Sequence, residues 1–168
     1  MTRRHLVMDS PVGGITLVAE DERLACLYMM DHRHAPDSDA FGPAVDSDAL
    51  LDEVRRQLEE YFEGIRTEFK VPLVDDVGTP FQRRVWAELL EIPYGETISY
   101  GELARRIGQP TAFRAVGLAN GKNPISIIVP CHRVVGSGGS LTGYGGGLDR
   151  KQRLLELEGK QSDEQTLF

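Results

Sequence analysis

Residues 99–120 read SYGELARRIGQPTAFRAVGLAN, and this stretch decides how we expect the second half of the chain to fold. Ser99 followed by Glu102 is a capping-box pattern, which predicts a helix that ends near Ile107-Gly108. A tight glycine-containing connection comes next, and a further helix is expected from about Ala112 to Asn120. Two short helices joined in this way are typical of a helix-turn-helix, although many helical hairpins do not bind DNA.

The sequence around this helical pair predicts a mainly α-helical C-terminal domain. Thr79-Pro80-Phe81-Gln82 supplies an N-cap, a proline at the first helical position and a glutamine at N3, which predicts another helix start. The run Ile125–Val129 is short, β-branched and apolar, so we expect a buried extended segment that stops at Pro130. Residues 136–147 contain seven glycines, and a last helix is expected from Asp149 to Glu158-Gly159.

The first half of the chain predicts a small α/β domain with a mixed or antiparallel sheet. Alternating apolar residues between turn residues predict strands, and apolar residues at helical spacing predict one helix. The expected elements are strands at 6–8, 15–19, 24–30 and 67–73, a loop over 31–46 and a helix over 48–62. Because Val74–Gly78 reads as a linker, we expect an N-terminal domain over 1–77, a C-terminal domain over 78–160 and a polar, frayed tail over 161–168.

Charge is distributed unevenly along the chain. The whole chain has a formal net charge of -7, which by itself argues against a nucleic-acid partner. Residues 1–77 hold 8 Lys and Arg against 17 Asp and Glu, whereas residues 99–153 hold 8 against 2. A local basic surface of this kind attracts a polyanion, although a solvated surface without a special role explains the same asymmetry.

The overall composition excludes several classes of protein. Hydrophobic residues make up 40% and charged residues 27% of the 168 residues, which is ordinary for a soluble globular protein. No apolar run approaches the length of a membrane span, and no apolar segment of a signal peptide follows the basic N-terminus. Two cysteines, Cys26 and Cys131, do not make a disulfide framework, so we expect a reducing cytoplasm.

Cys131 is the strongest candidate for a reactive group. It emerges from the apolar run and is followed by His132 and Arg133, which supply a base and positive potential of the kind that activates a thiol. Glu158 is unusual because an acid in the last turn of a helix opposes the helix dipole; buried near His132, it would orient the imidazole. The alternatives are a structural cysteine and a solvent-exposed acid. A zinc site at Cys131-His132 is not expected, since no companion ligand pair is present.

Further candidates lie on the second helix of the pair and in the glycine-rich segment. Arg114 has the small neighbours Ala115 and Gly117, which let a helix approach another surface closely, so Arg114 would enter a base stack or bind phosphate. An exposed solubilising arginine explains the same pattern. Tyr144, embedded among four glycines, suggests a loop that presents an aromatic ring to a planar ligand. Three polar residues follow at the end of the second helix, and they are interpreted either as hydrogen-bonding groups for a ligand or as a C-cap and its loop: Asn120, Lys122 and Asn123.

With these motifs in place, the chain resembles the O6-alkylguanine-DNA alkyltransferases. The resemblance is dense from Gly78 to Gly159 and looser before it, where Asp9–Gly13 fits the N-terminal opening of the family. The matching pieces are Pro93–Thr97, Ser99–Gly101, Arg114–Gly117, Asn123-Pro124, Ile128–Val134, Gly143-Tyr144 and Leu154–Gly159. The resemblance implies an RNase H-like N-terminal domain and a winged-helix-like C-terminal domain.

The resemblance also implies a role for each catalytic residue. Cys131 would accept the alkyl group, His132 would take its proton through a water, and Glu158 would orient His132. Asn123 would be a hinge whose hydrogen bonds hold the active-site segment. Tyr100 would help to turn out the phosphate of the target nucleotide and to protonate the leaving guanine. Because a thioether does not revert, each molecule would act once on O6-alkylguanine, and also on O4-alkylthymine.

The implied partner is double-stranded DNA, bound in the minor groove without sequence preference and without a cofactor. Arg114 would fill the gap left by the flipped nucleotide, since a base inside a duplex cannot reach a protein thiolate. The other residues expected at the DNA are Tyr100, Ala115, Gly117, Asn120, Lys122 and Arg133. The residues expected to line the guanine pocket are Pro130, Val134, Tyr144, Gly145 and Gly146. The free protein is expected to be a monomer, and cooperative binding along DNA stays open.

Two departures from the family and two rival functions limit the transfer of roles. Cys26 with His5, His32 and His34 does not match the N-terminal zinc ligands of some relatives, so no metal is expected. Gly145 stands where some relatives have serine, which leaves the preferred size of the alkyl group open.

The rival functions are a non-catalytic protein that flags alkyl lesions and an unrelated cysteine hydrolase. A sensor does not need a thiolate, and a hydrolase would leave the helix-turn-helix unexplained.

Overall fold

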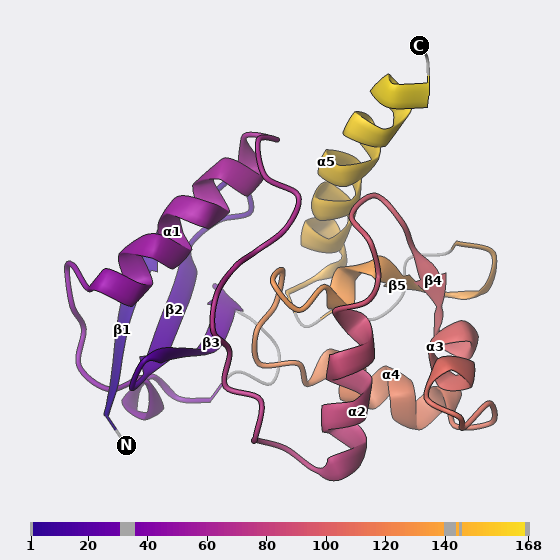
Figure 1. The fold of residues 1–168 in the computed structure, drawn as a ribbon, viewed down its shortest axis with the longest axis horizontal. Helices are drawn as coiled ribbons and strands as arrows, with labels where there is room; N and C mark the ends of the chain where they lie inside the picture. Colours follow the sequence, from indigo (N-terminus) through magenta and orange to yellow (C-terminus); the bar gives the residue numbers. More distant parts are fainter. Residues whose placement is uncertain (1, 31–35, 140–143, 145, 167–168) are drawn as a thin grey trace.

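The computed structural model describes residues 2–30, 36–139, 144 and 146–166. The N-terminal part is a three-stranded antiparallel sheet in the order β1-β2-β3, with one long helix packed on it (Figure 1). The described residues of the C-terminal part form four α-helices, two short 3-10 helices and a two-stranded parallel ladder. Its elements are α2 (Pro80–Leu89), β4 (Ile98–Ser99), α3 (Tyr100–Arg106), α4 (Phe113–Gly121), β5 (Val134–Val135) and α5 (Leu148–Thr166).

The N-terminal sheet forms from the predicted apolar segments, and β2 and β3 are buried along nearly their whole length. The strands are β1 (Arg3–Met8), β2 (Ile15–Glu20) and β3 (Arg23–Met29). A two-residue loop joins β2 to β3, and Asp21 has a φ of 51°, as expected in the tight turns that match the twist of a hairpin. The three strands predicted near the N-terminus are therefore confirmed. The described part of the loop predicted over 31–46 contains a short 3-10 helix, Ser38–Phe41.

Helix α1 (Ala49–Phe62) begins at a side-chain cap and buries one face. The carboxylate of Asp48 accepts hydrogen bonds from the backbone N–H groups of Leu50 and Leu51. The buried residues recur at helical spacing and pack toward the sheet: Leu51, Val54, Leu58 and Tyr61. Each such side chain contributes about 1.5–3 kcal/mol when it is fully buried. The helix predicted over 48–62 is confirmed.

The strand predicted over 67–73 is wrong. The segment forms only an isolated bridge between Leu73 and Leu24. The backbone N–H of Lys70 donates to the side-chain oxygen of Gln57 at 2.9 Å, and the amide of Gln57 donates back to the Lys70 carbonyl at 3.0 Å. A side chain of α1 therefore satisfies backbone groups that a neighbouring strand would otherwise bind. Pro72, which has no N–H, also disfavours a ladder here.

The helix-turn-helix is confirmed as α3 followed by α4. The cap of α2 is a complete capping box, in which Thr79 and Gln82 each bind the backbone of the other. At α3 only half of the predicted box forms: the Ser99 hydroxyl accepts from the N–H of Glu102, whose carboxylate turns instead to arginines on the next turn. The indole N–H of Trp86 donates to the carbonyl of Ala119 at 2.8 Å and ties α2 to α4.

Two expectations about the C-terminal part are wrong. The run Ile125–Val129 is buried, but it forms a turn, with Ile127 at a φ of 70° and the Val129 N–H bonded to the Ile125 carbonyl. Its backbone is closed by local hydrogen bonds, so it does not extend as a strand. Helix α5 continues to Thr166, well past the predicted end at Glu158-Gly159, because the residues after Gly159 include good helix formers.

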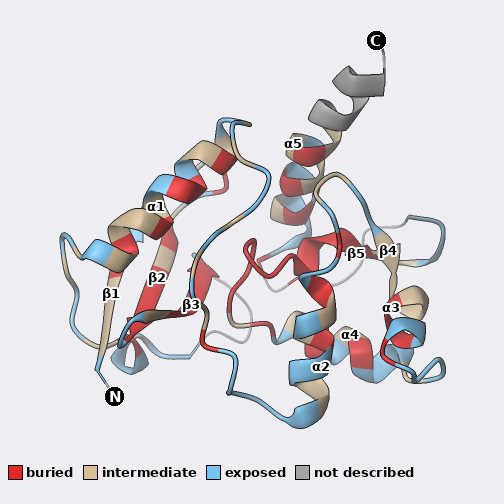
Figure 2. Cartoon of the chain, viewed as in Figure 1, coloured by how far each residue is buried: buried red, intermediate tan, exposed pale blue. Residues whose placement is uncertain are grey.

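The two parts of the chain share a hydrophobic core (Figure 2). The edge of β3 is covered by the segment that leads to Cys131: the Leu27 N–H donates to the Pro124 carbonyl at 2.9 Å, and the Ser126 N–H donates to the Leu27 carbonyl at 3.2 Å. The N-terminal sheet therefore supports the segment that carries the candidate nucleophile. Across the described residues, no helix has the length and apolar character of a membrane span.

Candidate active site

Cys131 opens a short 3-10 helix, Cys131–Arg133, and its side chain is buried. The turn before it is held by Asn123, whose amide donates to the Val129 carbonyl at 2.8 Å and whose oxygen accepts from the Ile125 N–H at 3.0 Å. These bonds span the turn that places Cys131 at the end of the buried segment.

Burial raises the pKa of the Cys131 thiol, because a thiolate is poorly solvated in the interior. Hydrogen bonds from Asn123 and Ser126 and the positive charge of Lys151 act in the opposite direction without cancelling the effect. The resting group is therefore a thiol, and its reaction requires a base.

His132 is fully buried beside Cys131 and has the properties of that base. Its Nε2 lies 2.7 Å from Oε2 of Glu158, and since a carboxylate only accepts, Nε2 carries the proton. Burial lowers the pKa of His132 more than Glu158 raises it, so the imidazole is neutral. Among the described residues, Nδ1 has no hydrogen-bond partner. Its lone pair is thus available to accept a proton.

Glu158 is the centre of a buried hydrogen-bonded cluster, although it comes from the middle of α5. It accepts from His132, from the Tyr61 hydroxyl at 2.6 Å, and from Arg133 through Nε at 2.9 Å and Nη2 at 3.1 Å. The N–H of Gly95 lies 3.4 Å from Oε1. Burial alone would raise the pKa of Glu158, but its bonds and charge interactions with His132 and Arg133 outweigh burial and lower it to about 2. Glu158 is therefore ionised.

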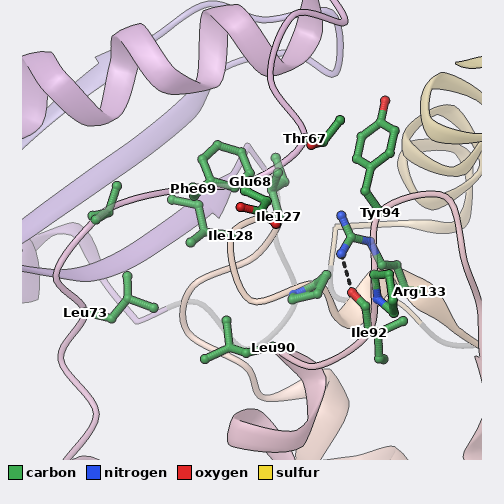
Figure 3. Close-up of a pocket in the computed structure, with 13 residues that line it drawn as sticks. Thr67, Glu68, Phe69, Leu73, Leu90, Ile92, Tyr94, Ile127, Ile128 and Arg133 are labelled. Atoms are coloured by element: carbon green, nitrogen blue, oxygen red, sulfur yellow. Dashed lines mark hydrogen bonds between the residues drawn. The ribbon is translucent and has the colours of Figure 1, made fainter.

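The structure places Arg133 and Asn120 differently from the sequence prediction, which put both at the DNA. Arg133 is 6% exposed, and besides Glu158 it binds the Ile92 carbonyl at 2.6 Å (Figure 3). Asn120 is 2% exposed, and its amide lies 3.3 Å from the Cys131 carbonyl. Both side chains point into the protein because the interior offers them acceptors, which favours a structural role beside the thiol over contact with DNA.

Lys151 is a buried charged residue beside the candidate site that was not predicted from the sequence. Its ammonium is buried, donates to the Val134 carbonyl at 2.6 Å and lies 5.8 Å from the centre of the Tyr100 ring. Burial lowers the pKa of Lys151 to about 8, with the negative charge of ionised Cys131 acting in the opposite direction. A base in the first turns of a helix opposes the helix dipole, and that anomaly is the sequence signal that was available.

Of the other predicted DNA contacts, Tyr100 begins α3, and the remaining ones lie on α4 or at its C-terminal end. Arg114, Ala115 and Lys122 are exposed, and Gly117 is half-buried. A Cβ added at Gly117 would lie 3.8 Å from the Tyr100 ring, so α3 and α4 bring these two positions together. Two large apolar side chains on the same helix, Phe113 and Leu118, are also exposed, at 52% and 64%.

The residues predicted to line a guanine pocket are only partly gathered by the structure. Val134 and Tyr144 are buried, and Gly145 lies outside the described residues. A Cβ at Gly146 would come within 2.8 Å of the Tyr144 ring and 2.9 Å of the Met29 sulfur, which explains the glycine. Pro130 instead lines a cavity of about 570 Å³ between the two parts of the chain, together with Phe69, Tyr94, Ile127 and Arg133 (Figure 3).

Comparisons with known proteins identify the family of this chain. Two family models match: 6-O-methylguanine DNA methyltransferase, ribonuclease-like domain, over residues 4–74, and its DNA binding domain over residues 80–160. The chain is 53% identical over 172 residues to the methylated-DNA--protein-cysteine methyltransferase of Mycobacterium tuberculosis H37Rv, with 98% of each chain covered. The chain belongs to the 6-O-methylguanine DNA methyltransferase family.

Other members of the family match over nearly the same length. The Methanosarcina acetivorans protein of the same name is 49% identical over 158 residues, covering 92% of this chain and 97% of that protein. A crystal structure of Mycobacterium tuberculosis OGT in complex with DNA superposes with a TM-score of 0.85 at 51% identity, covering 94% of each chain. The predicted fold class, a ribonuclease-like domain followed by a helical DNA-binding domain, is thereby confirmed.

Within the described part of the chain, no three His, Cys, Asp or Glu side chains gather as a group that would hold a metal. His32 and His34, two of the residues considered at the sequence level, lie outside that part. The expectation of no metal therefore stays a prediction.

Proposed function

We propose that this member of the family repairs O6-methylguanine in DNA by transferring the methyl group irreversibly to Cys131. One observation carries the proposal: a buried thiol adjoins a neutral His132 whose Nε2 is held by ionised Glu158 and whose Nδ1 is open. This is the nucleophile, base and orienting group of a thiol-activating site. The names of the relatives support the same reaction.

The proposed reaction needs no cofactor. His132 takes the thiol proton of Cys131 through a water, and the thiolate attacks the methyl carbon of the lesion. The sulfur–carbon bond forms as the carbon–O6 bond breaks, and the electron pair passes to the guanine, which takes up a proton. Overall, the thiol proton moves to guanine and S-methylcysteine remains. Reversal would have to expel the cysteine thiolate, which is a poor leaving group from a thioether, so the transfer ends the activity of that molecule.

The lesion must leave the base stack before it reaches a buried thiol. We propose that Arg114 occupies the vacated position and that Tyr100, next to α4 and Lys151, assists the departing guanine. The exposed side chains of Phe113 and Leu118 suit the apolar walls of a minor groove, where protein side chains wedge between base steps. Neither apolar side chain is explained by packing within the protein.

A site of this construction would also accept O4-alkylthymine, which presents the same electrophilic carbon next to a planar ring. A non-catalytic sensor of alkyl lesions is the alternative function. The sensor does not need His132 and Glu158 held beside a thiol, whereas the transferase needs both groups.

The test is mass spectrometry of the protein after incubation with a duplex that carries one O6-methylguanine. We expect one methyl group per protein, on the Cys131 peptide, and none in Cys131→Ser. Cys26→Ser is the matched control, because Cys26 is also buried with a raised pKa but is not adjacent to a histidine. It should react like the unmodified chain. If the protein binds the lesion but is not methylated, the proposed transferase function is wrong and the sensor function is favoured.

A further inference from the structure

A hydroxyl group on α1 connects the N-terminal part of the chain to the hydrogen-bonded cluster around Glu158. Tyr61, on α1, donates to Oε2 of Glu158 at 2.6 Å, across 97 positions of sequence. Both side chains are buried, with 0% of Tyr61 and 1% of Glu158 exposed. The other buried side chains on this face of α1 include Leu51, Val54 and Leu58, so this hydroxyl stands out on a mainly apolar face.

The ring of Tyr61 is fixed by aromatic neighbours. Its centre lies 5.3 Å from the ring of Phe62, 5.4 Å from Phe69 and 6.2 Å from Tyr94. The guanidinium of Arg133 lies 5.8 Å from the centre of the Tyr94 ring. The phenol is therefore packed in one orientation, with its hydroxyl directed at the carboxylate.

The hydroxyl shares its acceptor with the catalytic histidine. Oε2 of Glu158 accepts three hydrogen bonds: from Nε2 of His132 at 2.7 Å, from the Tyr61 hydroxyl, and from Nη2 of Arg133. Burial and the neighbouring carboxylate raise the pKa of Tyr61 well above 10, so the phenol stays protonated. Each additional donor withdraws negative charge from the oxygen, which makes that oxygen a weaker partner for a protonated imidazole.

We propose that Tyr61 is a positioning residue through which the N-terminal domain sets the basicity of His132. Donation to Oε2 keeps Glu158 in place and limits how strongly it favours the imidazolium. His132 then stays neutral at lower pH and is ready to accept the thiol proton. The inference rests on the proposed alkyl transfer to Cys131, and it gives the N-terminal domain a part in the chemistry.

The other charged and titratable groups around His132 and its partner Glu158 are Cys131, Arg133, Lys151, Tyr94 and Tyr144. Arg133 and Lys151 disfavour its protonation, and Tyr94 faces the same carboxylate from the segment between α2 and β4. Cys131 adjoins it in sequence. Tyr61→Phe leaves each of these side chains in the protein and removes only the hydroxyl, so a change in the titration of His132 reports the loss of that donor.

The first experiment compares Tyr61→Phe with the unmodified chain in the rate of methyl transfer as a function of pH. Without the hydroxyl, Oε2 holds the imidazolium more strongly, so the acidic limb of the profile should move up by about one pH unit. Below that limb the rate should fall by roughly tenfold, with the rate at high pH changed by less than about threefold. Tyr28→Phe is the matched control: Tyr28 is also buried, in the separate cluster formed with Val18, Ala25, Cys26, Phe41 and Val74, and its profile should not move.

The second experiment measures the titration of the His132 ring by NMR in the full chain without DNA. An upward shift of the same size in Tyr61→Phe is expected, and this result does not depend on whether the protein transfers methyl groups. If the unmodified chain does not transfer methyl groups, the proposed function is overturned. The effect of Tyr61 on His132 is then still decided by the NMR titration. Unchanged His132 titration in folded Tyr61→Phe would overturn the inference.

A second variant keeps the test decisive if Tyr61→Phe does not fold. Incorporating 3,5-difluorotyrosine at position 61 retains the hydroxyl and makes it a stronger donor. The titration of His132 should then move downward, opposite to the effect of phenylalanine. No movement in this variant would equally overturn the inference.

Discussion

The side-chain amide of Asn123 donates to the carbonyl of Val129 at 2.8 Å, across the buried turn that precedes Cys131. The turn includes Ile127 at a φ of 70°, a conformation that a β-branched residue rarely adopts. A strained backbone of this kind persists only when surrounding bonds hold it. Asn123 supplies two of those bonds from the end of the helix-turn-helix and acts together with the backbone bonds from Leu27, so the position of the thiol depends in part on this side chain.

Asn123→Ala should therefore lower stability and slow the reaction of Cys131. Loss of its buried bonds leaves the Val129 carbonyl and the Ile125 N–H without their partner, at a cost of about 2–4 kcal/mol. Denaturant unfolding measures the first effect, and the rate of Cys131 alkylation measures the second. Asn120→Ala removes a single 3.3 Å bond and should cost clearly less. Equal losses in the two variants would contradict this view of the turn.

Lys151→Met should make the thiol harder to ionise. The ammonium lowers the pKa of Cys131, so its removal should reduce the thiolate fraction by roughly threefold to tenfold. Lys151 loses its proton near pH 8, so the difference between variant and unmodified chain should be large below that pH and fade above it. Iodoacetamide labelling of Cys131 across this range measures the effect. Arg153→Met, exposed on the same helix, is the control and should change little.

Glu158→Gln should destabilise the protein at neutral pH and much less in acid. The variant leaves the buried guanidinium of Arg133 without its counter-charge, which costs about 3–5 kcal/mol. The pKa of Glu158 is lowered to about 2, so its contribution is present above its unfolded value near 4.5 and is lost as the pH falls toward 2. Urea unfolding of both proteins at several pH values measures the difference, which should narrow across that window.

An exposed glutamate provides the control for the acid experiment. The pKa of Glu53 is also lowered to about 2, by hydrogen bonds from Arg56 and Gln57, but the ion pair is exposed to solvent. Water and salt screen such pairs, so Glu53→Gln should have little effect at any pH. A loss as large as that of Glu158→Gln would mean that burial is not what makes the Glu158 cluster strong.

Arg114→Ala and Leu118→Ser should weaken repair of duplex DNA without damaging the thiol. Both side chains are exposed on α4, and neither contributes to the hydrophobic core. The rate with a lesion in a duplex should fall by at least about tenfold for Arg114→Ala, because unstacking the base costs a few kcal/mol. The rate with a free O6-alkylated guanine base should stay unchanged. Ile65→Ser, which alters an apolar residue of similar exposure outside α4, should affect neither rate.

Salt should weaken DNA binding steeply, since phosphate contacts release counterions. The sequence suggested a basic surface over residues 99–153, but the structure buries Arg133 and Lys151 and pairs Arg105 with Glu102. Fewer charges thus face DNA than the sequence count implied. Binding titrations with the same duplex at increasing salt measure the dependence, and an affinity that stays flat would remove phosphate contacts from the proposed interface.

The sequence by itself predicted most of the local elements and singled out Cys131 as the candidate nucleophile. These patterns involve residues that are only a few positions apart, so they can be recognised without knowledge of the fold. They are the capping residues Thr79 and Ser99, the helical spacing in α1, and the run Pro130–Arg133. The helix predictions succeeded because the local conformational preference agrees with the final structure. The predicted strand over 67–73 and the extended run before Cys131 failed where a side chain, Gln57 or Asn123, took over backbone hydrogen bonds.

Only the tertiary structure decided which polar and charged side chains contact one another in the candidate site. Tyr61, Arg133 and Glu158 come from three separate segments, and no periodicity relates α1 to α5. Burial then determined the chemistry: removal from water makes the ion pair strong, keeps His132 neutral and lowers the pKa of Lys151 to about 8. These effects depend on distance and on exclusion of solvent, which long-range packing creates and which the order of residues along the chain does not express.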